Sequence, residues 1–141
     1  MRLGGDAKTD LLKRVPLFAG CSKDELRQLA AVADELDLGE GASLTKEGAA
    51  GREFLILVEG TADVTRGEDT IAQLGPGDWL GEIALITKSP RTATVTATSS
   101  VRILVITDRA FRQVVETTPS IAVKVLEKLG ERIAGDQERT S

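Results

Sequence analysis

The sequence predicts an α+β fold that is mainly β, with an antiparallel roll or sandwich between helical segments. From about residue 36 to residue 106, short apolar runs such as "EFLILVEG" and "VRILVI" alternate with glycines, which is typical of short strands joined by turns. Glycine adopts positive φ angles at little cost, so we expect such angles at five turn glycines. These are Gly48, Gly60, Gly67, Gly75 and Gly77.

Two helical segments are expected before the strands, within about residues 8–34. The stretch "TDLLKRVPLF" predicts a short helix that ends at Pro16, because proline disfavours helical geometry at the residue before it. In "CSKDELRQLAAVADEL", Ser22 and Glu25 have the spacing of a capping box. The apolar face of this second helix consists of Leu26, Leu29, Ala30 and Ala33.

Two more helices are expected after the strands, within about residues 108–135. Asp108 can cap "RAFRQVVETT", and Pro119 precedes "SIAVKVLEKLGERIAG". An apolar stripe on the last helix requires a partner and consists of Ile121, Val125, Leu129 and Ile133. A basic ridge on the same helix is expected to face solvent and consists of Lys124, Lys128 and Arg132. We expect residues 1–141 to form a single domain, without an internal boundary.

The composition disfavours several kinds of partner. A net charge of −4 does not suit a surface for nucleic acid, which gains affinity by neutralising phosphates. The strongest apolar run, "FLILV", is too short to cross a membrane, and "MRLGGDAKTD" lacks an apolar signal core. With a single cysteine, Cys21, the chain cannot form an internal disulfide. We therefore predict a cytoplasmic protein that contacts neither nucleic acid nor membrane.

The residue types also disfavour catalysis. The chain contains no histidine, so it lacks the usual general base, the serine and cysteine dyads that depend on histidine, and the commonest metal ligand. A lone cysteine excludes zinc sites of the CxxC type. We therefore predict no enzymatic activity, no catalytic residue, no metal site and no cofactor.

The stretch "GEIALITKSPRTATV" carries the strongest functional signal. A short helix starting beside Gly81 would offer free backbone N–H groups to an anion, and Arg91 after Pro90 could reach the same anion. Glu82 would be repelled by a phosphate, but its carboxylate can accept a hydrogen bond from a hydroxyl. One arginine together with one carboxylate suits a ribose beside a singly charged phosphodiester.

The segment "LGEIALITKSPRTATVTA" resembles the phosphate-binding cassette of cyclic nucleotide-binding domains. The similarity extends from "PLFAGCSKDELRQLA" to the last helices and covers nearly the whole chain. It implies an eight-stranded, jelly-roll-like antiparallel β-roll with N-terminal helices, a short phosphate-binding helix and two C-terminal helices. It also implies that Glu82 accepts from the ribose 2′-hydroxyl, that Arg91 and the backbone amides of Ala84 and Thr92 hold the cyclic phosphate, and that Gly81 permits contact with the sugar.

The expected ligand-binding residues are Leu80, Gly81, Glu82, Ile83, Ala84, Arg91, Thr92 and Ala93. Core packing would explain Leu80 and Ile83, and also Val95, almost as well as a place in the base and sugar pocket. In the family, a threonine directly after the arginine can touch the base and help to bind guanine. The alternative is that Thr92 simply suits a strand, so Thr92 does not decide the base. We favour cAMP as the more common bacterial-type ligand and leave cGMP open.

These observations predict a regulatory sensor in which cyclic nucleotide binding moves the C-terminal helices. The alternative is a degenerate β-roll that acts only in protein interaction or dimerisation. A homodimer through the last helix is one expected partner, and an effector domain or protein outside this chain is another. The sequence does not determine whether the chain is complete or part of a longer protein, nor its oligomeric state, affinity or effector.

Overall fold

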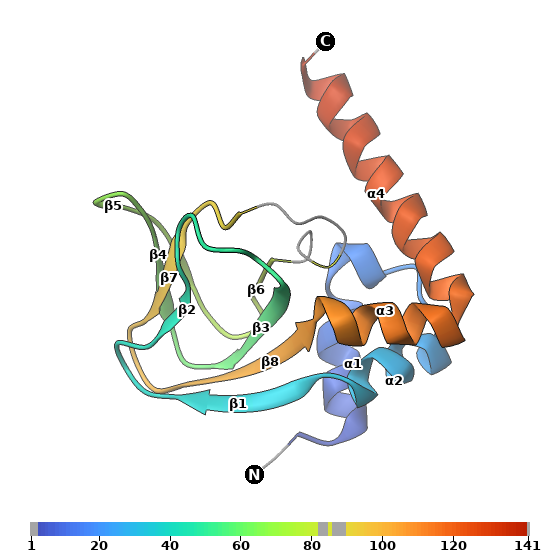
Figure 1. The fold of residues 1–141 in the computed structure, drawn as a ribbon, viewed down its shortest axis with the longest axis horizontal. Helices are drawn as coiled ribbons and strands as arrows, with labels where there is room; N and C mark the ends of the chain where they lie inside the picture. Colours follow the sequence, from blue (N-terminus) through green and yellow to red (C-terminus); the bar gives the residue numbers. More distant parts are fainter. Residues whose placement is uncertain (1–2, 82–84, 86–89, 141) are drawn as a thin grey trace. The chain divides into compact units, whose positions relative to one another are not determined.

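The computed structural model describes residues 3–81, 85 and 90–140, with the exception of the side chains at 132, 133 and 135–140. It divides into two compact units. The helical unit comprises residues 3–32 and 110–140, and the roll unit comprises residues 33–109. As the sequence predicts, helices come first along the chain, the strands follow, and two further helices come last (Figure 1).

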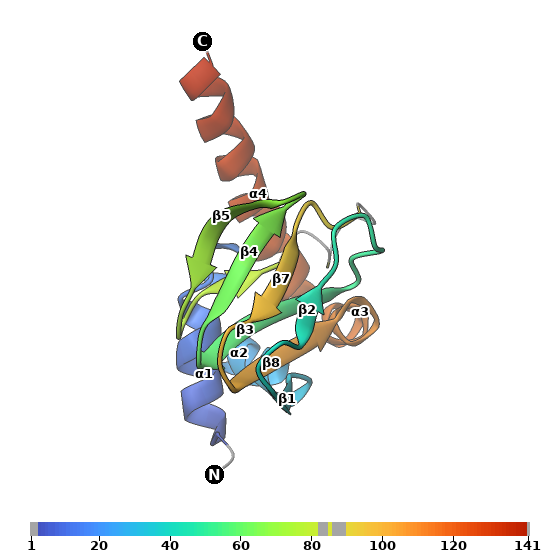
Figure 2. The same cartoon turned by 90° about the vertical axis from the view of Figure 1, so that its left-hand side faces the viewer.

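The roll unit consists of two antiparallel four-stranded sheets, with strand orders β1-β8-β3-β6 and β2-β7-β4-β5. Figure 2 shows the second sheet face-on. The described strands are β1 (Asp34–Leu38), β2 (Ser43–Thr45), β3 (Glu53–Glu59), β4 (Ala62–Arg66), β5 (Asp69–Leu74), β6 (Trp79–Leu80), β7 (Thr94–Ala97) and β8 (Val101–Thr107). The described part of the chain thus has the predicted β-roll architecture with flanking helices.

The core of the roll lies between the two sheets. Alternate side chains of β3 and β8 point into it, because successive residues of a strand face opposite sides of the sheet. Its buried members are Leu55, Leu57, Ala97, Val101, Ile103 and Val105. Phe54, Ile56 and Leu104, on the opposite face of the same strands, are also fully buried. Burial on both faces explains why "FLILV" and "VRILVI" are almost continuously apolar.

Four of the five expected turn glycines have positive φ angles, and the fifth does not. The prediction is confirmed for Gly48, Gly60, Gly67 and Gly77. It is wrong for Gly75, whose N–H donates to Asp78 Oδ2 at 2.7 Å. The Asp78 side chain stabilises this turn by accepting from the main chain, so the turn needs no left-handed residue at position 75.

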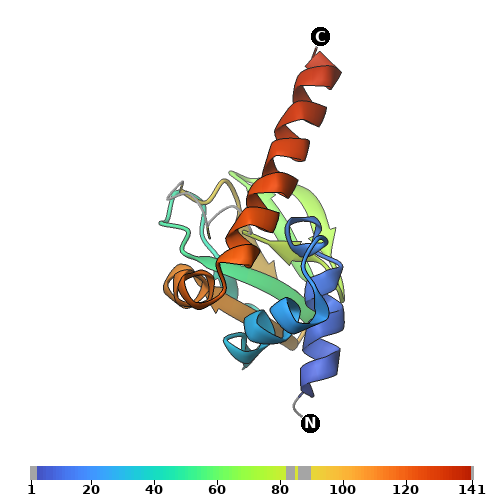
Figure 3. The same ribbon diagram turned by 90° about the vertical axis from the view of Figure 1, so that its right-hand side faces the viewer.

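The helices are α1 (Gly5–Lys13), the 3₁₀ turn η1 (Pro16–Phe18), α2 (Lys23–Ala31), α3 (Asp108–Thr117) and α4 (Pro119–Thr140), and all but the first two residues of α3 belong to the helical unit. The predicted capping box of α2 is confirmed: Ser22 Oγ accepts from the Glu25 N–H, and the Glu25 carboxylate accepts from the Ser22 N–H. The Phe18 ring of η1 lies 6.3 Å from the Phe111 ring, centroid to centroid. Figure 3 shows α4, in orange to red, running past η1 toward the C-terminus.

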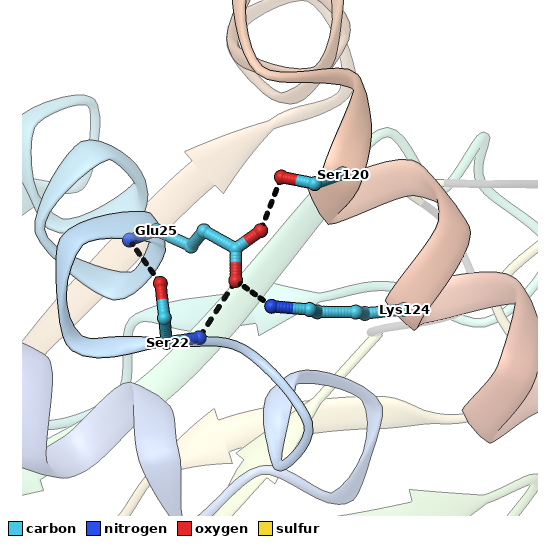
Figure 4. A network of polar contacts seen from close by, with 4 residues as sticks. All are labelled: Ser22, Glu25, Ser120 and Lys124. Atoms are coloured by element: carbon cyan, nitrogen blue, oxygen red, sulfur yellow. Dashed lines mark hydrogen bonds and ion pairs between the residues drawn. The ribbon is translucent and has the colours of Figure 1, made fainter.

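The first turns of α4 are fixed to α2 by the buried Glu25 carboxylate (Figure 4). Glu25 accepts from Ser120 Oγ and forms an ion pair with Lys124 Nζ, in addition to its bond with the Ser22 N–H. Lys124 is 33% exposed, about as much as Lys128 at 34%, so it lies on the predicted ridge and in addition pairs with the buried carboxylate. Lys128 pairs with Glu131 at 3.3 Å.

The apolar stripe of α4 is divided between core and surface. Ile121 and Val125 are buried, and α4 packs against η1 of the same unit. Leu129 is only partly buried, and the side chains of Arg132 and Ile133 lie outside the described part of the structure. Two neighbouring apolar residues, Val123 and Leu126, are 54% and 62% exposed.

Candidate functional site

The main chain of Arg91 is held by the loop that joins β2 to β3. Its N–H donates to the Ala49 carbonyl at 2.8 Å, and its own carbonyl accepts from the Gly48 N–H at 2.9 Å. An isolated β-bridge between Ala50 and Pro90 continues this pairing. Arg91 is therefore fixed through both backbone groups before the chain enters β7.

The side chain of Arg91 is half-buried and turns toward the start of β3. Its Nη2 donates to the backbone carbonyl of Glu53 at 2.5 Å. Burial lowers the pKa of Arg91, and the charge of Glu53 opposes that effect. Because a guanidinium remains charged at every physiological pH, this contact positions a permanent positive charge.

Gly81 lies against this guanidinium. A Cβ at position 81 would be 2.1 Å from Arg91 Nη1 and 2.6 Å from the Glu53 carbonyl oxygen. The φ angle of Gly81 is also +78°, which side chains disfavour. Only glycine fits here, so the structure brings together two of the predicted site residues, Gly81 and Arg91.

The segment after Arg91 is tied to neighbouring strands by its carbonyl groups. Thr92 is exposed, and its carbonyl accepts from Arg66 Nε at 3.1 Å. The Ala93 carbonyl accepts from Thr45 Oγ1 at 3.1 Å. These bonds fix the backbone of Thr92 and Ala93, whose contacts with a ligand stay predictions.

The remaining predicted site residues fall into two groups. Leu80, in β6, is partly buried and packs against the core of the roll, and Val95, in β7, is a buried apolar residue. The core-packing interpretation of these two side chains therefore agrees with their positions. Glu82, Ile83 and Ala84 lie outside the described residues, so their predicted roles stay predictions.

Two residues of this site were not identified from the sequence. Glu53 contributes its backbone carbonyl, which no pattern of side chains reveals. Gly51 is buried next to the Arg91 side chain. In the sequence it is marked only by its position shortly before an apolar run. Both lie about 40 positions from Arg91 in the chain.

The described residues were also searched for metal sites and for membrane-spanning helices. In residues 3–81, 85 and 90–140, no three His, Cys, Asp or Glu side chains are grouped so that they could hold a metal ion. No helix in that same part of the chain is long and apolar enough to span a membrane.

Comparison with protein families identifies the chain. The family model described as "Cyclic nucleotide-binding domain" matches residues 35–118, and the chain belongs to this family. The cAMP-dependent protein kinase regulatory subunit of Mycosarcoma maydis is 34% identical over 138 residues, which cover 89% of this chain and 25% of that protein. The chain spans about a quarter of the length of the curated relatives that it matches.

Solved structures show the same fold. The N-terminal domain of a transcriptional regulator from Streptomyces coelicolor A3(2) superposes with a TM-score of 0.86 at 28% identity, covering 92% of this chain and 96% of that one. The cAMP-bound PfPKA-R superposes with a TM-score of 0.68 at 25% identity, covering 89% of this chain and 47% of that one.

Proposed function

We propose that this chain is a sensor module that binds a cyclic nucleotide, with Arg91 pairing with the cyclic phosphate. The observation that carries the proposal is the placement of the Arg91 guanidinium against Gly81, with both backbone groups of Arg91 held by the β2–β3 loop. A charged donor fixed beside bare backbone suits an anion that must approach closely. Both units of the chain are proposed to belong to a single ligand-binding domain.

Charge matching supports a cyclic phosphodiester as the ligand. Such a group carries one negative charge, which one guanidinium can neutralise through two parallel hydrogen bonds. A nucleoside triphosphate would carry several more charges and usually bring a divalent cation. Glu82 is proposed to accept from the ribose 2′-hydroxyl, and the amides of Ala84 and Thr92 to donate to the phosphate.

The proposed nucleotide is cAMP, with cGMP kept as the alternative. Support comes from the relatives, because the kinase regulatory subunit is described as cAMP-dependent and PfPKA-R was solved with cAMP. Thr92 keeps cGMP open, since its exposed side chain follows Arg91 directly and could donate to a guanine base.

The proposed output is a movement of α3 and α4 on ligand binding, which requires different contacts in the free and bound states. A homodimer through α4 is proposed as well, because Val123 and Leu126 expose apolar surface on that helix. The effector that reads the movement is proposed to be a domain or protein outside this chain, in the cytoplasm. A degenerate roll used only for protein contacts is less well supported, because it would not need Arg91 to be so closely held.

Isothermal titration of the wild type and Arg91→Ala with cAMP, cGMP and 5′-AMP tests the proposal. We expect the wild type to prefer a cyclic nucleotide over 5′-AMP and the variant to bind at least about 30-fold more weakly, the equivalent of about 2 kcal/mol for a charge-assisted pair. The cAMP recovered after titration should be unhydrolysed, because we propose binding without catalysis.

Arg52→Ala is the matched control, since Arg52 is an exposed arginine beside the same loop. It removes the same charge and should change affinity less than about threefold, because exposed charges are screened by salt. Equal binding by the wild type and Arg91→Ala would refute the assignment of Arg91 as the phosphate ligand.

A further inference from the structure

We propose that Gly51 is a positioning residue for Arg91: its missing side chain leaves the space that the outer part of the arginine occupies. The inference rests on the proposed function, because Arg91 matters to affinity only if it binds the ligand. It assigns a role in ligand binding to a residue of the β2–β3 loop outside the cassette.

The contact distances at Gly51 define that space. A Cβ built at this position would lie 3.0 Å from Arg91 Cδ, 3.0 Å from Nε and 3.3 Å from Cζ. Carbon atoms in favourable contact are about 3.5–4.0 Å apart, so a methyl group here would press on three successive atoms of one side chain. Gly51 is itself buried.

The Arg91 side chain has little freedom to yield. Its Nη1 already lies against Gly81, and its Nη2 is bonded to the Glu53 carbonyl. Its backbone is held at Gly48 and Ala49. A methyl group at position 51 therefore requires the Arg91 side chain or its loop to shift by a few tenths of an ångström, which strains the bond to the Glu53 carbonyl.

The main-chain conformation does not explain the glycine. Gly51 is not among the glycines with positive φ, so alanine can adopt its backbone angles. The tight contact that a side chain would make comes from Arg91, 40 positions later in the sequence.

The test compares Gly51→Ala with Gly39→Ala by titration with cAMP and cGMP. Gly39 is the matched control, because a Cβ there would meet nothing within 4 Å and its φ is also not positive. We expect about a tenfold loss of affinity in Gly51→Ala, since a displaced guanidinium loses most of its charge-assisted pairing. The change in Gly39→Ala should stay below about twofold.

A double-mutant cycle separates positioning from a general effect on the loop. In the Arg91→Ala background there is no guanidinium to displace, so adding Gly51→Ala should cost less than about twofold in affinity. A tenfold loss that persists in this background would overturn the proposal, because Gly51 would then act independently of Arg91.

The results for Arg91→Ala and Gly51→Ala show whether this inference fails, the proposed function fails, or both hold. If Arg91→Ala weakens binding and Gly51→Ala does not, the inference fails and the proposed function stands. If Arg91→Ala binds like the wild type, the proposed function fails. If Gly51→Ala does not fold, the double variant decides: restored folding supports a clash with Arg91, and a double variant that is also unfolded refutes it.

Discussion

Replacing Glu25 with glutamine should destabilise the helical unit by about 2 kcal/mol. The buried carboxylate, only 5% exposed, accepts from the Ser22 N–H at 2.7 Å, from Ser120 Oγ and from Lys124 Nζ. It therefore closes the capping box of α2 and fixes the first two turns of α4 at the same time. The substitution keeps the shape of the side chain and removes its charge.

The magnitude follows from the bonds that change. A glutamine oxygen can still accept from Ser22 and Lys124, and the Ser120 hydroxyl can rotate to accept from the new amide. What disappears is the negative charge of the acceptor: the bond from Ser22 becomes neutral, and the Lys124 ammonium keeps its charge but loses its anionic partner. About 1 kcal/mol for each of the two bonds to the retained oxygen gives the expected total of about 2 kcal/mol.

Urea unfolding followed by two signals provides the assay. Circular dichroism at 222 nm reports mainly on the helices, whereas the fluorescence of Trp79, the only tryptophan, reports on β6 of the roll. With an m-value of about 2 kcal/mol/M, the dichroism midpoint should fall by about 1 M urea. Glu116→Gln, at an exposed glutamate of α3, is the control. Equal midpoints for the two variants would refute the reasoning.

The pH dependence gives a second test of the same carboxylate. Hydrogen bonds from Lys124, Ser120 and Ser22 lower the pKa of Glu25 from 4.5 to about 2. A lowered pKa stabilises the folded state fully above the unfolded value and loses this effect as the pH falls toward the folded value. The difference between the wild type and Glu25→Gln should be constant from pH 7 to 5 and shrink from pH 4.5 to 2. A difference that is already lost at pH 6 would contradict this pKa.

Two further predictions concern the helical unit. Burial raises the pKa of Cys21 from 9.0 to about 11, so at pH 8 its thiolate fraction should be roughly 100-fold smaller than that of an unperturbed thiol. Reaction with Ellman's reagent should accordingly be slow until urea unfolds the helices, and rapid labelling of the native protein would contradict the burial. Leu126→Glu should convert the proposed dimer to a monomer in analytical ultracentrifugation, because Leu126 is 62% exposed on α4. Glu116→Gln should leave the mass unchanged, and a monomeric wild type would refute the dimer.

The parts of the fold that depend on neighbouring residues could be predicted from the sequence. The capping box between Ser22 and Glu25 spans three positions, and both of its hydrogen bonds form as the spacing predicts. The strands are marked by apolar runs between glycines; β3 and β8 become buried structure, whereas β5 is exposed along almost its whole length. Gly75 shows the limit of this reasoning, because the Asp78 side chain stabilises its turn without a positive φ angle.

The sequence predicted the main residues of the site, but it did not predict the surrounding groups that hold Arg91 in place. The cassette pattern identified Gly81 and Arg91, which the structure brings into contact. It could not identify the Glu53 carbonyl or Gly51, because backbone acceptors and empty spaces leave no pattern of side chains. Pairing of the loop at Gly48 with Arg91 depends on register between distant segments, which sequence spacing does not encode.

At Glu25 and Gly51, the local structure does not account for the whole residue, and the unexplained part indicates a contact with a residue distant in the sequence. A capping-box glutamate needs one oxygen for its local bond, so a buried Glu25 has further acceptor capacity that a cation must satisfy, and Lys124 does so from 99 positions away. A turn likewise does not explain a buried glycine whose φ is not positive. At Gly51, the absence of a side chain makes room for the neighbouring Arg91 side chain. In both cases the local structure uses only part of what the residue offers. The unused acceptor capacity of Glu25 and the absent side chain of Gly51 each indicate a partner that is distant in the sequence.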